Sequence, residues 1–281
     1  MPTFTDEHGI AITYDVWPVS NPRAVIQIAH GVGEHAQRYA GLARHLNANG
    51  FAVYADDHRG HGRTGMAQWD GDATRLGHLG DGGLRAAVAA VRQFSGIIRD
   101  ENPDLPLAIL GHSWGSFMVQ MILDHHSADY DLAVLSGSAY RLPGYLNSGD
   151  LKKRYAHLGT TGMEWLSRDP EVAQGFVDDP LTTSVPLAKL FGPADTLRII
   201  GRPARNFARD LPLLLQVGGG DPVGGERSVR RLERAYRERS GLTDVTTIVY
   251  PDARHEVFNE TNRADVMADL TVWLDARLAR R

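Results

Sequence analysis

Short apolar runs bounded by turn residues recur along this chain and alternate with longer stretches in which apolar residues follow helical spacing. Short apolar runs are typical of buried strands, and helical spacing is typical of helices that cover a sheet. The pattern predicts strands at Ile10–Val16, Ala24–Ala29, Phe51–Ala55, Leu105–Leu110, Leu132–Ser136, Leu211–Val217 and Thr246–Tyr250. It predicts helices at Tyr39–Ala48, Gly83–Ile98, Gly115–His125, Arg227–Arg239 and Arg263–Leu278.

The order of these elements predicts the fold class. Strands that alternate with helices are joined by right-handed crossovers, so we expect an α/β fold with a mostly parallel central sheet covered by helices on both faces. The amino-terminal stretch from Phe4 to Val16 differs, because turn residues His8 and Gly9 interrupt it. We interpret this stretch as an antiparallel hairpin on the sheet edge.

One interval, from about Arg141 to Arg205, lacks a convincing apolar strand and is rich in Gly and Pro. It contains short amphipathic pieces at Lys152–Leu158 and Leu187–Ile200. Insertions of this size in a compact domain are usually functional. We therefore expect a core of residues 1–140 and 206–281, interrupted after the sixth strand by a helical cap over 141–205. The alternative is that the interval supplies two ordinary crossover helices of the sheet.

Composition narrows the possible classes of protein. The 281 residues, 42% hydrophobic and 23% charged, suit one large α/β domain or two small ones. A net charge of -4 gives no electrostatic case for binding nucleic acid. The Arg-rich stretch from Glu226 to Arg239 also contains Glu, and it reads as a solvated, ion-paired helix face.

The absence of cysteine excludes disulfides, thiolate metal sites and cysteine nucleophiles. The first residues, Met1 to Glu7, lack the basic start and the apolar core of a signal peptide. No apolar run approaches the ~20 residues of a membrane helix. We therefore expect a cytoplasmic protein.

The pentapeptide Gly111-His112-Ser113-Trp114-Gly115 lies where a predicted buried strand meets a predicted helix. This is the context of a nucleophile elbow, in which a serine on a sharp turn projects its hydroxyl beyond the end of the sheet. The small flanking glycines let strand and helix approach each other closely. The position of the motif therefore makes Ser113 a candidate nucleophile.

A serine nucleophile needs an imidazole to take its proton and a carboxylate to orient that imidazole. In α/β-hydrolase folds these groups follow the serine in the order acid, then histidine. Asp221 follows the predicted strand Leu211–Val217, and His255 follows the predicted strand Thr246–Tyr250. Both loops are expected at the same sheet edge as Ser113, so these three residues form the candidate triad.

Several other residues are weaker alternatives. Asp252 fits a role in its own turn after Pro251, while Asp195 falls in the expected cap and Asp244 precedes a strand. A metal site without the H-E-x-x-H motif is disfavoured, so we expect no metal. The histidines that would form such a site are His30, His35, His58 and His61. A triad mechanism is complete without a cofactor, so we expect none.

Acyl transfer also needs hydrogen-bond donors for the oxyanion, each worth about 3 to 4 kcal/mol in other enzymes. One donor is expected from the residue after the nucleophile, the backbone N–H of Trp114. The second is expected from the glycine-rich loop after the strand Ala24–Ala29, where the Val32 N–H is the candidate. Val32 and Trp114 are therefore also candidate substrate-contacting residues.

Several segments together resemble the monoacylglycerol lipase and lysophospholipase-like branch of the α/β hydrolases. They are His30–His35 with Arg38-Tyr39, Asp57–Arg63, the elbow, Ala253–Glu256 with Asn259-Glu260, and the cap pieces Trp165–Asp169 and Asp179–Leu181. The resemblance runs through nearly the whole chain. It implies that Ser113, Asp221 and His255 are the triad, that Val32 and Trp114 donate to the oxyanion, and that the substrate is a small monoacylglycerol-like or lysophospholipid-like ester.

The chain departs from the family pattern at three positions. Methionine is common where this chain has Trp114, and a second glycine where it has Ser116. The Trp114 indole could form an aromatic wall of the acyl pocket or simply pack beneath the elbow. The eukaryotic lipases carry a cysteine where this chain has Gly224, so thiol reagents are not expected to inhibit it.

The same triad also serves aminopeptidases, lactonases and carbon-carbon hydrolases, and some such folds only bind ligands. An aminopeptidase would need an acidic clamp for the substrate amine, which Glu164, Asp169 or Asp178 could provide. The cap mixes charged with apolar residues, which is weak evidence for contact with a lipid surface. The leading expectation is a serine esterase that forms an acyl-enzyme.

Overall fold

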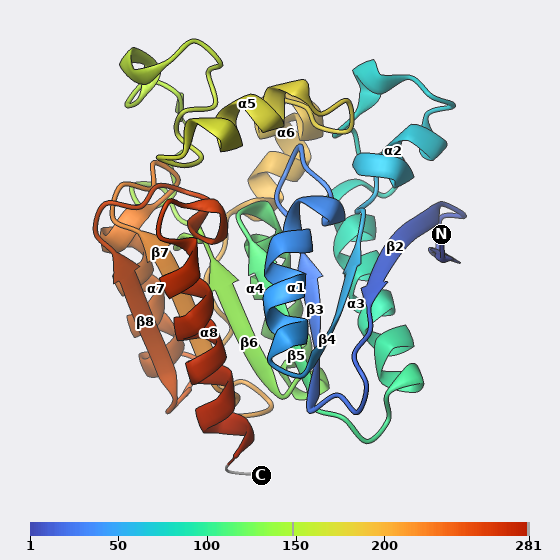
Figure 1. The fold of residues 1–281 in the computed structure, drawn as a ribbon, viewed down its shortest axis with the longest axis vertical. Helices are drawn as coiled ribbons and strands as arrows, with labels where there is room; N and C mark the ends of the chain where they lie inside the picture. The colour runs from blue at the N-terminus through green and yellow to red at the C-terminus, as the bar shows by residue number, and fades with distance from the viewer. Residues whose placement is uncertain (148, 280–281) are drawn as a thin grey trace.

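The computed structural model describes residues 1–147 and 149–279. Their strands form one eight-stranded sheet in the order β1-β2-β4-β3-β5-β6-β7-β8 (Figure 1). β2 is antiparallel to β1 and β4, and all the other neighbours are parallel, which confirms the mostly parallel sheet. The strands are β1 (Thr3–Thr5), β2 (Ala11–Trp17), β3 (Ala24–Ala29), β4 (Phe51–Asp56), β5 (Leu107–His112), β6 (Leu132–Ser136), β7 (Leu213–Gly218) and β8 (Val245–Tyr250).

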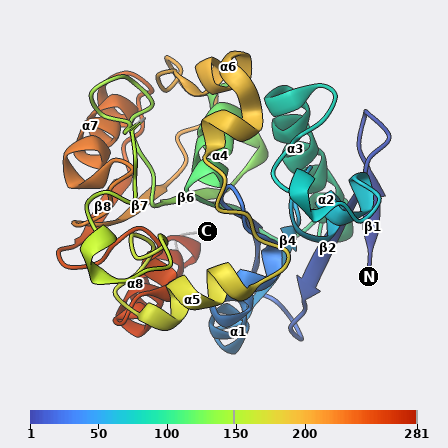
Figure 2. The same cartoon turned by 90° about the horizontal axis from the view of Figure 1, so that it is seen from above.

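Helices cover both faces of this sheet. Figures 1 and 2 show α1 and α8 on one face and α3, α4 and α7 on the other. Each face has its own apolar core, because every side chain of the central strand β3 is buried and successive residues point to opposite faces. These helices are α1 (Ala40–Ala48), α3 (Gly83–Glu101), α4 (Trp114–His126), α7 (Gly225–Glu238) and α8 (Arg263–Leu278).

The insertion between β6 and β7 forms a cap. Figures 1 and 2 show its helices α5 (Pro170–Asp178) and α6 (Leu187–Ile199) over the end of the sheet where the parallel strands finish. Asp169 caps the amino-terminal end of α5, where its carboxylate accepts the Glu171 N–H at 3.1 Å. α6 is kinked at Gly192. The helical cap after the sixth strand is therefore confirmed, and the alternative of two crossover helices packed on the faces of the sheet is not what the structure shows.

Two local predictions need correction. The expected amphipathic piece Lys152–Leu158 forms turns that end in a short 3-10 helix, Ala156–Leu158, because a piece this short and rich in adjacent positive charges does not hold an isolated helix. A helix that the sequence pattern did not predict, α2 (Gly62–Gln68), follows β4. The further 3-10 helices are Ala36–Tyr39, Ala73–Arg75, Ser127–Asp129 and Val257–Asn259.

None of the helices in the described ranges combines the length and the apolar character needed to cross a membrane. The amino-terminal hairpin was correctly predicted: β1 pairs with β2 at the edge of the sheet, and the turn between them contains Gly9.

Candidate active site

The elbow places Ser113 at the junction of β5 and α4. Its backbone adopts φ 53° and ψ -124°, a region that side-chain-bearing residues rarely occupy. The turn is closed by hydrogen bonds from the Ser113 N–H to the Ser136 carbonyl (2.9 Å) and from the Ser116 N–H to the Ser113 carbonyl (2.9 Å). A Cβ at Gly115 would lie 2.2 Å from the Ala29 carbonyl oxygen, so only glycine permits this approach of α4 to β3.

The loops after β7 and β8 bring Asp221 and His255 together. His255 Nδ1 lies 3.0 Å from Asp221 Oδ1, and both side chains are buried. The same carboxylate oxygen accepts the Val223 N–H at 2.8 Å, which fixes its orientation. His255 Nε2 has no hydrogen-bond partner among the described residues and is the ring nitrogen left for a proton transfer. This arrangement suits His255 as a general base whose ring is oriented by the Asp221 carboxylate.

The rival acids have other roles. Asp252 is exposed, and Asp244 pairs with Arg277 at 2.7 Å. Asp195 lies in α6 and accepts the Leu84 N–H at 3.0 Å, at the start of α3. Asp221 is therefore the acid that the geometry favours as the partner of His255.

The pKa of His255 is set by two opposing effects. Burial lowers it, but the neighbouring carboxylate of Asp221, with smaller effects from Glu256 and Glu34, outweighs burial and raises the pKa of His255 above its ordinary value. The adjacent histidine behaves differently, because burial and the nearby His255 lower the pKa of His112 to about 3. His112 is thus neutral at physiological pH, while His255 is poised to gain or lose a proton.

This difference predicts the pH dependence of the reaction. Only neutral His255 can accept a proton, so kcat/KM is expected to fall as the pH drops through a pKa that lies above 6.5, the ordinary value for histidine. In an Asp221→Asn variant the raising effect is lost, and the midpoint of the acid limb should move to lower pH. The rate of labelling by a fluorophosphonate, measured from pH 4 to 9, checks both profiles. A midpoint that the substitution leaves in place would contradict the pairing.

The loop after β3 approaches the nucleophile closely. A Cβ at Gly31 would lie 3.1 Å from the Ser113 Cβ, which places the neighbouring Val32 beside the elbow. No hydrogen bond from the Val32 or Trp114 amide is found within the described residues. These two N–H groups are therefore available donors, as the oxyanion prediction requires.

A buried ion network ties this loop to the histidine loop. Arg38 donates from Nη1 to Glu34 Oε2 and to Glu256 Oε1, both at 2.7 Å, and from Nη2 to Glu256 Oε2 at 2.9 Å. Glu34 in turn accepts the Gly31 N–H at 2.6 Å and the Tyr39 hydroxyl at 2.8 Å. One guanidinium thus links the oxyanion loop to the residue that follows His255.

The cap is fastened to the same histidine loop. The Glu256 N–H donates to the Leu166 carbonyl at 2.7 Å, and the Arg168 N–H donates to Glu260 Oε1 at 3.0 Å. The Trp165 ring lies 5.0 Å from the His255 ring between centroids. Sequence reasoning placed Trp165 only in a family-like cap segment and did not identify it as a neighbour of His255.

A cavity of about 270 Å³ lies between the cap and the elbow, and Ser113, His255 and Val32 all line it. Most of its other walls are apolar. The apolar lining residues include Phe117, Leu146, Leu151, Met163, Trp165, Leu166, Phe176, Leu187, Ile199 and Val223.

Trp114 is placed away from this cavity. Its indole is 1% exposed and is not among the described residues that line the cavity. The ring stacks on His61 at 5.1 Å between centroids and is covered by Phe191 of α6 at 5.0 Å. This placement favours packing beneath the elbow over a wall of the acyl pocket, so its expected substrate contact is reduced to the backbone N–H.

The histidines that could have formed a metal cluster make internal hydrogen bonds. His58 Nδ1 pairs with Asp56 at 2.7 Å, and His30 accepts the His58 N–H at 3.0 Å. His61 Nδ1 lies 2.8 Å from the Arg59 carbonyl, and His35 Nε2 pairs with Asp179 at 2.8 Å. Across residues 1–147 and 149–279 we find no group of three or more His, Asp or Glu side chains arranged to hold a metal ion.

Comparisons with known proteins identify the family of this chain and several of its relatives. Residues 20–262 match the family described as serine aminopeptidase, S33. The chain is 35% identical to a monoacylglycerol lipase of Mycolicibacterium smegmatis, over 98% of this chain and 97% of that one. It is 26% identical to the mouse monoglyceride lipase, over 99% of this chain and 91% of that one.

The fold has a close counterpart among solved structures. A thermostable carboxyl esterase from Bacillus coagulans superposes with a TM-score of 0.80 at 24% identity, covering 99% of this chain and 98% of that one. At that identity the likeness establishes the fold alone. The family match and the near-complete coverage of the mycobacterial relative together show that this chain belongs to the serine aminopeptidase S33 family of α/β hydrolases.

Proposed function

We propose that this protein is a serine carboxylic-ester hydrolase that cleaves monoacylglycerol- or lysophospholipid-like esters through an acyl-enzyme. Ser113 attacks the ester carbonyl while His255 takes its proton, and the Val32 and Trp114 amides donate to the oxyanion. His255 then protonates the leaving alcohol. In the second half of the reaction His255 activates water, which releases the fatty acid and restores Ser113.

The observation that carries this proposal is the apolar cavity at Ser113. An acyl chain gains from burial against such walls by about 0.8 kcal/mol for each CH₂ group. The mycobacterial and mouse relatives, which are named as monoacylglycerol and monoglyceride lipases, support the same substrate class. Five large exposed apolar side chains belong to the cap segment, where each can contact a lipid-like substrate phase: Leu158, Val177, Val185, Leu197 and Ile200.

The aminopeptidase alternative lacks its acidic clamp. None of Glu164, Asp169 and Asp178 lines the cavity in the described part of the chain. Of the acids that do line it, Glu34 and Glu256 are both ion-paired with Arg38, and Asp150 is exposed and accepts the Lys152 N–H at 3.0 Å. A substrate ammonium group would find no buried, unpaired carboxylate there.

A panel of substrates tests the proposal. We expect turnover of monoacylglycerols and short-chain p-nitrophenyl esters, with kcat/KM rising with acyl length until the cavity is filled, and no measurable turnover of amino-acyl arylamides. Lysophosphatidylcholine separates the two head-group classes. Faster cleavage of arylamides than of esters, or failure to react with a fluorophosphonate, would overturn the proposal.

A further inference from the structure

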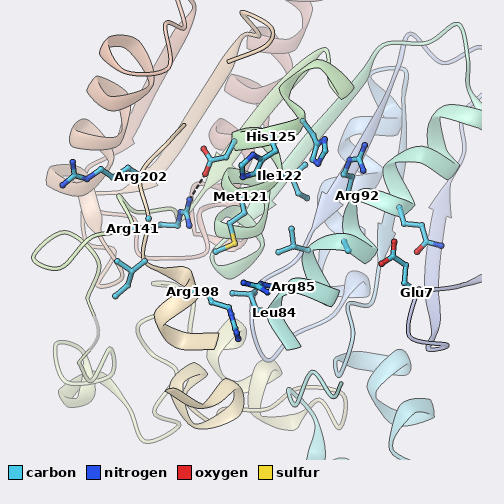
Figure 3. A pocket seen from close by; sticks show the side chains of 17 residues that line it. Glu7, Leu84, Arg85, Arg92, Met121, Ile122, His125, Arg141, Arg198 and Arg202 are labelled. Atoms are coloured by element: carbon cyan, nitrogen blue, oxygen red, sulfur yellow. Dashed lines mark hydrogen bonds and ion pairs between the residues drawn. The ribbon is translucent and has the colours of Figure 1, made fainter. Parts of the chain in front are cut away.

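A separate hollow of the described structure lies away from Ser113. It is a surface groove of about 730 Å³ on the face of the sheet covered by α3 and α4 (Figure 3). Its walls come from Leu84–Gln93 of α3, Met121–His126 of α4 and the segment Arg198–Arg202 at the end of α6. We name it the α3–α4 groove.

The floor of the α3–α4 groove is apolar. Leu84 and Ile122 are each 1% exposed, while Val88 and Met121 are half-buried and Ile200 is 43% exposed. A helix rises 1.5 Å per residue, so Leu84 and Val88 cover about 6 Å along α3, and Met121, Ile122 and Ile200 continue the floor across to α4 and the segment after α6. An alkyl chain of medium length can lie along it and remove apolar surface from water.

The rim of the α3–α4 groove is cationic. Five arginines line it against two acids, Glu7 and Asp124. The groove is therefore locally positive, although the whole chain carries a net charge of -4. Figure 3 shows the arginines distributed along the groove, with Arg85 and Arg198 close to Met121. The arginines are Arg85, Arg92, Arg141, Arg198 and Arg202.

The arginines differ in how far they are already neutralised. Arg141 is buried and pairs with Asp124 at 3.3 Å, and Arg92 pairs with Asp129 at 3.1 Å. Arg85 and Arg202 are exposed and form no ion pair or hydrogen bond with other described residues. The Arg85 guanidinium, beside the apolar floor, is thus free to receive an acid group, and Arg202 carries a second unpaired positive charge farther along the rim (Figure 3).

We propose that the α3–α4 groove is a second ligand site, which binds an anionic amphiphile. The acid head, a carboxylate or a phosphate, contacts Arg85, and the alkyl chain lies along the apolar floor. Arg202, farther along the rim, adds a second positive charge that attracts the anion (Figure 3). A wholly apolar ligand would leave the guanidinium groups without a partner, and an inorganic anion would leave the floor exposed. The site does not depend on any reaction at Ser113.

A ligand in the α3–α4 groove can influence the cap, because the end of α6 borders both the groove and the Ser113 cavity. Ile199 lines the Ser113 cavity, whereas the next residue, Ile200, lines the α3–α4 groove. Buried Arg141 donates to the Ile199 carbonyl at 2.9 Å and so holds the end of α6 between the two spaces. A ligand that favours one position of this segment changes affinity in the cavity, and by linkage the reverse also holds.

Two methionines allow the groove and the cavity to be observed separately. Met121 lines the α3–α4 groove and Met163 lines the Ser113 cavity. With ¹³C-methyl methionine in the full-length protein, titration with decanoate or decyl phosphate should shift the Met121 signal saturably. Decyltrimethylammonium, which has the same chain and the opposite charge, should not. The tighter of the two anions identifies the preferred head group.

A matched pair of variants tests the role of charge. An Arg85→Gln/Arg202→Gln variant is expected to bind decanoate about tenfold more weakly at Met121. An Arg44→Gln/Arg234→Gln variant loses the same charge from exposed positions on α1 and α7 and should bind as the unmodified protein does.

Four results would overturn the proposal. They are a shift of Met163 alone, equal binding of the cationic amphiphile, equal weakening by both double variants, and a Met121 response to anionic vesicles but not to monomeric amphiphiles. The first would mean that decanoate binds only in the Ser113 cavity, and the last that the groove meets a lipid surface.

Discussion

Replacing Ser113 with alanine is expected to lower kcat for ester hydrolysis by about 10⁴- to 10⁶-fold. The substitution removes the nucleophile and leaves the backbone strain unchanged, because alanine and serine are equally strained at φ 53°. The loss should therefore appear without a fall in thermal stability. Initial rates on a p-nitrophenyl ester, together with a melting curve for each protein, measure both effects.

A serine elsewhere in the same cavity provides the control. Ser184 is exposed and lines the cavity from the cap side. Ser184→Ala should keep kcat within about threefold, since no step of the proposed reaction uses its hydroxyl. Full activity of Ser113→Ala, or fluorophosphonate labelling that survives in it, would mean that another residue is the nucleophile.

Replacing Arg38 with alanine is expected to destabilise the protein by about 3–5 kcal/mol at neutral pH. The side chains of Glu34 and Glu256 are 4% and 5% exposed, and without the guanidinium they remain buried and unpaired. In the unmodified protein burial raises the pKa of Glu256, but Arg38 outweighs this and lowers it. Loss of Arg38 reverses that shift, so the variant's deficit in unfolding free energy should be smaller at pH 5 than at pH 8.

Urea denaturation at both pH values measures this difference. The exposed pair Arg23–Asp275, with side chains 48% and 47% exposed, supplies the control, and Arg23→Ala should cost less than about 1 kcal/mol at either pH. The Arg38 variant should also lose kcat, because Glu34 holds the oxyanion loop through the Gly31 N–H. An equal deficit at both pH values with unchanged kcat would contradict the role assigned to the network.

The sequence pattern predicts the core well, since buried parallel strands are short apolar runs and their covering helices are amphipathic. α8 begins and ends where the pattern predicted, and β5 lies two residues further along than expected. The pattern does not predict α2, because Gly62 and Gly65 disfavour a helix. That segment is held by its surroundings, where Asp57 accepts the Arg63 N–H at 2.8 Å and Thr64 accepts the Thr13 N–H at 2.9 Å.

The candidate triad could be predicted because it depends on the order of its residues along the chain. A serine at an elbow, followed by an acid and a histidine after later parallel strands, is expected to converge at one sheet edge. Chain order says nothing about pairs such as Arg38 and Glu256, which meet across 218 positions. Whether an aromatic side chain at Trp114 faces ligand or protein depends on Phe191 of the cap, and the spacing of residues does not encode that contact.

The backbone at Ser113 places two kinds of selection in conflict. Its φ of 53° and ψ of -124° suit glycine, and a glycine there would relieve about 1–3 kcal/mol of strain. The hydroxyl is then lost, so a gain in heat resistance comes with the loss of the nucleophile. A library of variants screened only for melting temperature would therefore enrich glycine at position 113 and discard the chemistry, whereas one screened for turnover would retain the strained serine.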